Sequence, residues 1–139
     1  MAIPFFRKGE NKMRIIECID TVDGLKPNQY TKEDKLKWLS TLDANIHEDI
    51  LKTHERNPDE EEIAEFIPYA VDDMEKVLIA PFPYDELYVA YLKMKIDEEN
   101  GEIARYNNSA ILFNSYMDNY AKFYNKHHRP ISNKNFKMY

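Results

Sequence analysis

The spacing of apolar residues in the first part of the chain predicts two helices. Apolar residues at helical intervals mark a first helix over 12–23, which we expect to end at Gly24, a residue suited to a left-handed C-terminal cap. After a proline-containing turn, Thr31 can cap a second helix. This helix begins near Lys32, carries a wide apolar stripe and fades near His54.

The second half of the chain predicts two more helices, of which the last has the strongest period. One begins near Asp85 and runs to Asn100, where Gly101 either breaks the helix or lies inside a longer one. Beyond Gly101, apolar residues recur three and four positions apart, so we expect a long helix with an apolar stripe facing the core. The members of this stripe are Ile103, Tyr106, Ala110, Phe113, Met117, Tyr120 and Tyr124.

Between the second and third helices the pattern changes to short apolar runs. The runs 65–71 and 76–81 are separated by turn-like residues, which favours one short antiparallel pair of strands. Only three glycines occur in 139 residues, which disfavours a turn-rich all-β domain. The sequence therefore predicts a mainly α fold: a small bundle of about four helices, with room for one short β-hairpin and with extended arms at both ends.

The charges are unevenly distributed along a chain whose length fits one domain. We divide it into an N-terminal arm (1–11), a helical domain (12–126) and a basic C-terminal tail (127–139). Residues 59–75 hold eight acidic side chains and no basic one, whereas the stretch from Lys122 to the end holds five cations and no acid. The net charge of -6 disfavours tight binding to DNA phosphates.

Candidate catalytic and metal-binding patterns are weak. His47 and His54 lie seven residues apart, whereas two zinc ligands on one helix face need a four-residue step. The acidic run lacks the spaced loop pattern of a calcium site, and the single cysteine, Cys18, sits in an apolar run typical of a buried side chain. We therefore expect no enzyme activity, no metal and no cofactor. No apolar run is long enough for a membrane span or a signal peptide, so we expect a soluble protein of a reducing compartment.

The last helix carries an ordered set of polar residues beside its apolar stripe. Asn100, Asn107 and Asn114 repeat every seven residues along one flank. Two interpretations stay open: an ordinary amphipathic helix with a solvated flank, or a helix that also contacts a neighbouring subunit. For the second, the candidate contact residues are Arg105, Asn107, Asn108 and Asn114, and in the N-terminal arm Phe5 and Phe6.

Two long stretches carry a family resemblance. They are "LKPNQYTKEDKLKWLSTLDANI" and "PYDELYVAYLKMKIDEENGEIARYNNSAILFNSYMDNYAKFYNKHHRP". Their most specific parts are a KPNxY turn, a PYDxLY helix start, and the motif NGExxRYNNSxxxFN followed by an HxxP-like motif. On these motifs residues 13 to about 130 resemble small proteins of tailed phages and prophages of Gram-positive hosts, namely the head-tail connector, or adaptor, proteins of long-tailed phages. The N-terminal arm extends beyond the resemblance.

The resemblance implies a structural role in the virion. It implies a mostly helical subunit that forms a ring, commonly a dodecamer, beneath the portal protein at the capsid vertex, with a head-closure (stopper) or tail-completion protein below. DNA would only pass through the channel of such a ring, and the protein would be found in the virion neck and, during assembly, in the host cytoplasm. The residues it assigns to portal contact are those of the tail: His127, His128, Arg129, Pro130, Lys134, Phe136, Lys137 and Tyr139.

Two other functions remain as alternatives. A phage DNA-packaging or regulatory protein associated with nucleic acid could use the cations Lys122, Lys126 and Arg129, together with Lys134 and Lys137. A small enzyme could use His47, Glu48 and His54, and this is the weaker of the two.

Overall fold

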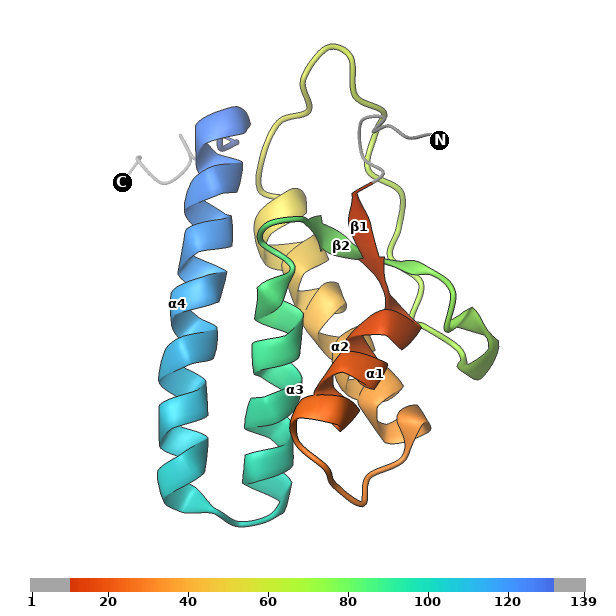
Figure 1. Cartoon of the computed structure of the whole chain (residues 1–139). Coiled ribbons are helices and arrows are strands. Elements are labelled where there is room, and N and C mark those ends of the chain that lie inside the picture. Colours follow the sequence, from red (N-terminus) through yellow and green to blue (C-terminus); the bar gives the residue numbers. More distant parts are fainter. Residues whose placement is uncertain (1–10, 132–139) are drawn as a thin grey trace, which may run out of the picture.

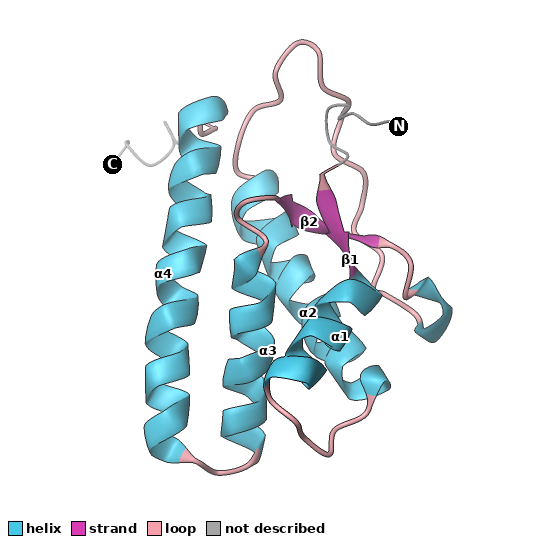
Figure 2. Cartoon of the chain, viewed as in Figure 1, coloured by secondary structure: helices cyan, strands magenta, loops and turns pink. Residues whose placement is uncertain are grey.

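The computed structural model describes residues 11–131, and within that range it contains four α-helices and one two-stranded antiparallel sheet (Figures 1 and 2). The predicted mainly α bundle with a short strand pair is therefore confirmed. The elements are β1 (Lys12–Arg14), α1 (Ile15–Leu25), α2 (Lys32–Ile46), a π-helical turn (His47–Leu51), a 3-10 turn (Val71–Asp73), β2 (Val77–Pro81), α3 (Glu86–Glu99) and α4 (Ile103–His127).

Helix α1 differs from its prediction at both ends. It starts at Ile15 because Lys12–Arg14 forms a strand, and the Glu17 carboxylate accepts a hydrogen bond from the Arg14 N–H at 2.9 Å. Gly24 lies inside the helix, which ends only when the Lys26 N–H donates to the Val22 carbonyl. Among the described residues, positive φ occurs at Gly101 and not at Gly24. The prediction of a left-handed cap at Gly24 is therefore wrong.

Helix α2 begins as the capping residues predict. The Thr31 side chain accepts from the Asp34 N–H at 3.0 Å, and the Asp34 carboxylate accepts from the Thr31 N–H at 3.2 Å. This reciprocal pair satisfies two backbone donors that the first turn of a helix leaves free. The helix continues into the π-helical turn up to Leu51, so the long second helix of the prediction is present with a looser last turn.

The strand pair uses a different partner from the one predicted. Residues 77–81 form β2 as expected, but β2 pairs with β1 and not with 65–71. The register joins Lys12 to Pro81 and Arg14 to Val77, with an irregularity between them. Residues 65–70 instead form an irregular segment (Figure 2). A pairing across more than 60 residues gives no local signal in the sequence, which explains the wrong partner.

Helices α3 and α4 form an antiparallel hairpin at one edge of the molecule (Figure 1). Between them Gly101 has φ of 74°, a left-handed conformation that glycine adopts without steric cost. Its N–H donates to the Glu98 carbonyl, and the Glu102 N–H donates to the Asp97 carbonyl, both at 3.0 Å. Gly101 therefore ends α3 and does not lie inside a longer helix.

The hydrophobic core lies between α1, α2, α3 and the sheet, and the C-terminal half of α4 contributes two tyrosines. Its fully buried apolar side chains come from all three of these helices and from β2. The larger members are Ile15, Ile19, Leu36, Leu39, Ile46, Leu78, Leu87, Tyr88, Leu92, Ile96 and Tyr120.

A single carboxylate at the centre of this core joins three parts of the fold. Asp43 on α2 is 0% exposed and accepts hydrogen bonds from the hydroxyls of Tyr69 at 2.5 Å and Tyr88 at 2.6 Å, and from the Ile79 N–H at 3.2 Å. The Tyr88 hydroxyl in turn accepts from the Ala80 N–H at 2.7 Å. Burial raises the pKa of Asp43 to about 6, although these hydrogen bonds oppose the rise. The network fixes α3, β2 and the irregular segment 65–70 to α2.

We predict that Tyr88→Phe destabilises the protein by about 1–3 kcal/mol, because it leaves a carboxylate oxygen and the Ala80 N–H buried without their partner. Urea denaturation measures this loss. Tyr30→Phe is the matched control, since it removes an exposed hydroxyl that donates to Asn100 and should cost within about 0.5 kcal/mol. Equal losses for the two variants would contradict a structural role of the Asp43 network.

Candidate interaction surface

Helix α4 is held in place through one face, which packs chiefly on α3. The contact is rich in aromatic pairs: the rings of Tyr91 and Phe113 lie 5.1 Å apart, and those of Tyr84 and Phe123 stack at 4.5 Å. Near the start of the helix, the Ser109 hydroxyl donates to the buried Asp97 of α3 at 2.7 Å. Lys26 pairs with the same carboxylate at 2.8 Å, so Asp97 links the end of α1 to both helices of the hairpin.

The predicted apolar stripe of α4 is buried only toward the C-terminus. Tyr120 and Tyr124 are buried, whereas Tyr106, Ala110, Phe113 and Met117 are half-buried. Ile103 is 73% exposed, so its assignment to the core is wrong. It lies directly after the Gly101 turn, at the end of the hairpin, where α3 has already ended.

The opposite side of α4 forms a continuous exposed surface. Counting at 3.6 residues per turn, the positions farthest from the α3 contact are spaced four and three apart. They are Ala104, Asn108, Ile111, Ser115, Asp118 and Lys122, all exposed, and we call this set the outer face of α4. Ile111 lies at its centre and is 70% exposed. Asn108 and Ser115 flank Ile111 on this face, and both side chains can donate and accept hydrogen bonds.

Of the three asparagines in the predicted flank, Asn107 and Asn114 lie beside the outer face, whereas Asn100 ends α3 and accepts a hydrogen bond from the Tyr30 hydroxyl at 2.7 Å. The side chains of Asn107, Asn108 and Asn114 are exposed and make no hydrogen bond to another described residue. Arg105 is 3.5 Å from Glu102 one turn before it, and both side chains are largely exposed. The structure therefore brings the four predicted contact residues to the solvent side of one helix, with free amide groups beside Ile111. Whether a neighbour contacts them stays a prediction.

Basic and aromatic side chains surround a hollow at the C-terminal end of α4. The hollow has a volume of about 710 Å³ and is lined by Tyr84, Asn119, Lys122, Phe123, Lys126 and His127 among others. The stacked rings of Tyr84 and Phe123 supply its apolar part, and His127 lies 4.6 Å from Phe123 between ring centres. Lys122 pairs with Asp118 at 2.9 Å, whereas Lys126 has no carboxylate partner in the described chain. The hollow therefore combines positive charge with an aromatic wall.

The first residues after α4 are attached to their own domain. The Glu55 N–H donates to the Arg129 carbonyl and the Ile131 N–H to the Thr53 carbonyl, each at 2.8 Å. His128 is 9% exposed, stacks on Tyr124 with ring centres 4.0 Å apart, and lies 2.9 Å from the Glu60 carboxylate. Burial alone would raise the pKa of Glu60, but hydrogen bonds from the Asn57 N–H and from His128 hold it below its usual value. This part of the predicted tail is thus a fixed strap.

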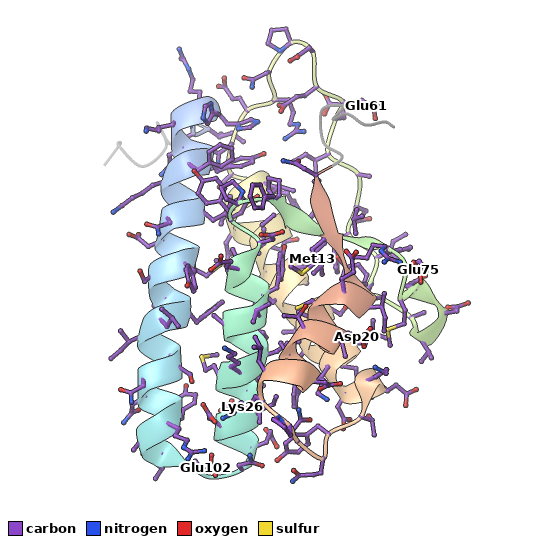
Figure 3. All side chains as sticks on the ribbon, viewed as in Figure 1. Met13, Asp20, Lys26, Glu61, Glu75 and Glu102 are labelled. Carbon is purple, nitrogen blue, oxygen red and sulfur yellow. The ribbon has the colours of Figure 1, made fainter. Side chains whose placement is uncertain are left out.

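The acidic run starts beside the C-terminal end of α4, where Glu60 meets His128, and continues to the side of the molecule away from α4. Figure 3 shows Glu61 and Glu75 on the side away from α4. Several of its carboxylates have partners: Glu75 pairs with Arg14, Asp73 with Lys76, and Glu60 with His128. Four others are exposed and make no ion pair or hydrogen bond through the carboxylate to any described residue: Glu61, Glu62, Glu65 and Asp72. Ile67 and Val71 lie among them and are 70% and 56% exposed.

The histidines of the weak enzyme hypothesis serve the fold. His47 is buried and its Nε2 lies 2.8 Å from the Ala64 carbonyl. His54 lies 2.6 Å from the Ile50 carbonyl through Nδ1 and 2.5 Å from Asn125 through Nε2. Within residues 11–131, no three side chains of the metal-binding types lie close enough to hold a metal ion. The described helices include none that is long and apolar enough to cross a membrane.

Several predicted contact residues fall outside the described range: Phe5 and Phe6 before it, and Lys134, Phe136, Lys137 and Tyr139 after it. The exposed surface of α4 could be expected from the heptad and its asparagines. The strap formed by 128–131 was missed, because an aperiodic segment with a proline carries no signal of contacts that reach about 70 residues back. Comparison with known protein families, curated proteins and solved structures finds no match for this chain.

We predict that His128→Gln loosens the strap. Losing the stacking on Tyr124 and weakening the pair with Glu60 costs about 1 kcal/mol, so the Ile131 and Glu55 amides should exchange with solvent roughly fivefold faster. Hydrogen–deuterium exchange followed by NMR measures both amides. His127→Gln is the matched control because His127 is exposed and should leave both rates unchanged. Unchanged rates in His128→Gln would show that the strap does not depend on His128.

Proposed function

We propose that this chain is a structural subunit of a phage virion, a head-tail connector that assembles into a ring between the portal and the tail. The proposal rests on the resemblance of its KPNxY, PYDxLY and NGExxRYNNSxxxFN motifs to that family. Its partners are further copies of itself, commonly twelve in such rings, the portal protein and a head-closure or tail-completion protein. The subunit acts by binding alone, in the host cytoplasm during assembly and in the neck of the finished virion.

The observation that carries the proposal is the outer face of α4. A helix at the edge of the molecule presents Ile111 at the centre of a solvent-facing stripe, with small residues along the stripe and unpartnered asparagine amides beside it. Interfaces between subunits combine a buried apolar centre with a polar rim that supplies hydrogen bonds. The acidic run continues to the side of the molecule away from α4 (Figure 3). A contact between two unlike sides of the same protein is heterologous, and such contacts form a ring when the rotation from one copy to the next closes on itself.

The charge of the protein agrees with a channel through which DNA passes. The net charge is -6, so a ring of many copies repels phosphates overall and does not hold the DNA by counterion release. The second candidate, a nucleic-acid-associated protein, is favoured by one observation only: the lysines and stacked rings at the C-terminal end of α4 offer both charge and a stacking surface.

We predict that Ile111→Glu prevents ring assembly while leaving the subunit folded. The side chain is exposed in the single subunit, so the melting temperature should change little, whereas a charge buried between subunits should weaken association at least about tenfold. Analytical ultracentrifugation and electron microscopy, with and without the portal protein, measure assembly. The double variant Asn107→Ala/Asn114→Ala should weaken assembly less.

Leu25→Glu is the matched control, because it places the same charge at an exposed apolar residue at the end of α1, which is not part of the outer face of α4. It should assemble as the wild type does. Rings formed by Ile111→Glu at wild-type concentrations would contradict the assigned surface. A wild-type protein that forms no ring, alone or on the portal, and is missing from purified virions by mass spectrometry, would overturn the proposed function itself.

A further inference from the structure

We propose that the hollow at the C-terminal end of α4 receives the acidic segment, residues 61–72, of a neighbouring copy. This inference rests on the proposed ring and names the surface that the outer face of α4 meets. It follows from two features of the same chain that are complementary in charge and in apolar character, and whose charged groups do not pair with each other within the described part of one subunit.

The hollow is suited to an acidic strand with apolar side chains. Lys122 continues the outer face of α4, and Lys126 follows one turn later, without a carboxylate partner in the described chain. Beside them the stacked rings of Tyr84 and Phe123 form an apolar wall, and Asn119 adds an amide that can bond to a passing backbone. A volume of about 710 Å³ is enough for several side chains of a peptide segment.

The acidic segment offers the matching groups. The four exposed carboxylates of Glu61, Glu62, Glu65 and Asp72 lack partners within the described chain, which leaves their charge available to lysines of another copy. Ile67 and Val71 are exposed among them and can pack on aromatic rings. The segment is also pre-organised, because the Tyr69 hydroxyl donates to Asp43 and the Tyr69 N–H to the Ser40 hydroxyl. Little conformational entropy is therefore lost when the segment docks.

The acidic run begins beside the hollow, where Glu60 meets His128, and its exposed carboxylates from Glu61 onward lead away from α4. Helix α4 forms one edge of the molecule, and Glu61 and Glu75 lie on the side away from it (Figure 3). None of the described acidic residues of 61–72 pairs with Lys122 or Lys126 within the same chain. Two unlike, complementary surfaces join one copy to the next in the same direction, which is the arrangement that a ring requires.

A second copy explains the hollow better than a nucleic acid does. Ile67 and Val71 match the apolar wall, and the carboxylates of the acidic segment match the lysines. A nucleic acid, by contrast, would be repelled by the acidic run and by the net charge of -6. Binding of a nucleic acid at Lys122 and Lys126 is therefore kept as the opposing outcome of the test.

Two charge-reversed variants of the full chain test the contact. In the first, Lys122→Glu and Lys126→Glu make the hollow acidic; in the second, Glu62→Lys and Glu65→Lys make the segment basic. Each variant alone meets like charge with like charge, so assembly should weaken at least about tenfold relative to the wild type. In an equal mixture each hollow finds an oppositely charged segment on the other variant, and ring assembly should return. Sedimentation velocity at low salt measures all three samples.

The control reverses two lysines elsewhere, Lys37→Glu and Lys52→Glu. Lys52 pairs with Glu48 one turn away at 3.1 Å, as Lys122 pairs with Asp118 at 2.9 Å, so the local losses are alike. This control should assemble as the wild type does, and circular dichroism melting confirms that every variant is folded.

Two results would overturn the contact: a charge-reversed variant that assembles alone as well as the wild type, or a mixture that fails to assemble although the wild type does. Retention of a labelled oligonucleotide that is lost in the Lys122→Glu/Lys126→Glu variant, with its ring assembly unchanged, would assign the hollow to nucleic acid instead. In each of these cases the wild-type ring persists and the proposed function stands. If the wild type itself does not assemble, the proposed function fails and this contact fails with it.

Discussion

Helix α4 packs along its length on α3, and only its C-terminal turns also meet the segment 54–57, so most of the helix is held through one face. The contact is secured by stacked aromatic rings toward the C-terminal end and by Asp97, which binds Ser109 of α4 and Lys26 at the end of α1. A long helix held by one face leaves the opposite face in solvent. On α4 that face carries Ile111, small residues and asparagine amides, which is why we assign it to contact with another subunit.

The core determines the position of the acidic segment, residues 61–72. Asp43 binds the hydroxyls of Tyr69 and Tyr88, and through Tyr69 it holds the acidic segment against the domain. The segment has little regular structure, yet its position is fixed by this buried anchor and by the ion pair between Glu75 and Arg14. Stability and binding are therefore linked in this protein: a change that disturbs the Asp43 network should also move the exposed carboxylates and Ile67.

Much of the fold could be predicted from local patterns, since helix periods, the Thr31 cap and the Gly101 break depend on neighbours in sequence. The misses come from contacts between distant residues. Lys12–Arg14 looked like the start of a helix but pairs with Val77–Pro81, and Ile103 looked like core but lies beyond the end of α3. His128 looked like part of a free tail but is held by Tyr124 and Glu60. Of the seven-residue asparagine repeat, Asn107 and Asn114 lie on the exposed side of α4, whereas Asn100 ends α3 and bonds to Tyr30.

The central claim is that the outer face of α4 becomes buried when subunits assemble. Cys18 is the single cysteine of the chain, fully buried, and burial raises the pKa of its thiol well above the usual range, so it is inert to thiol reagents. Ser115→Cys therefore places one reactive thiol on the outer face of α4. We expect a maleimide to label the free subunit fully and the assembled ring only weakly. Equal labelling of the free subunit and the ring would contradict the account.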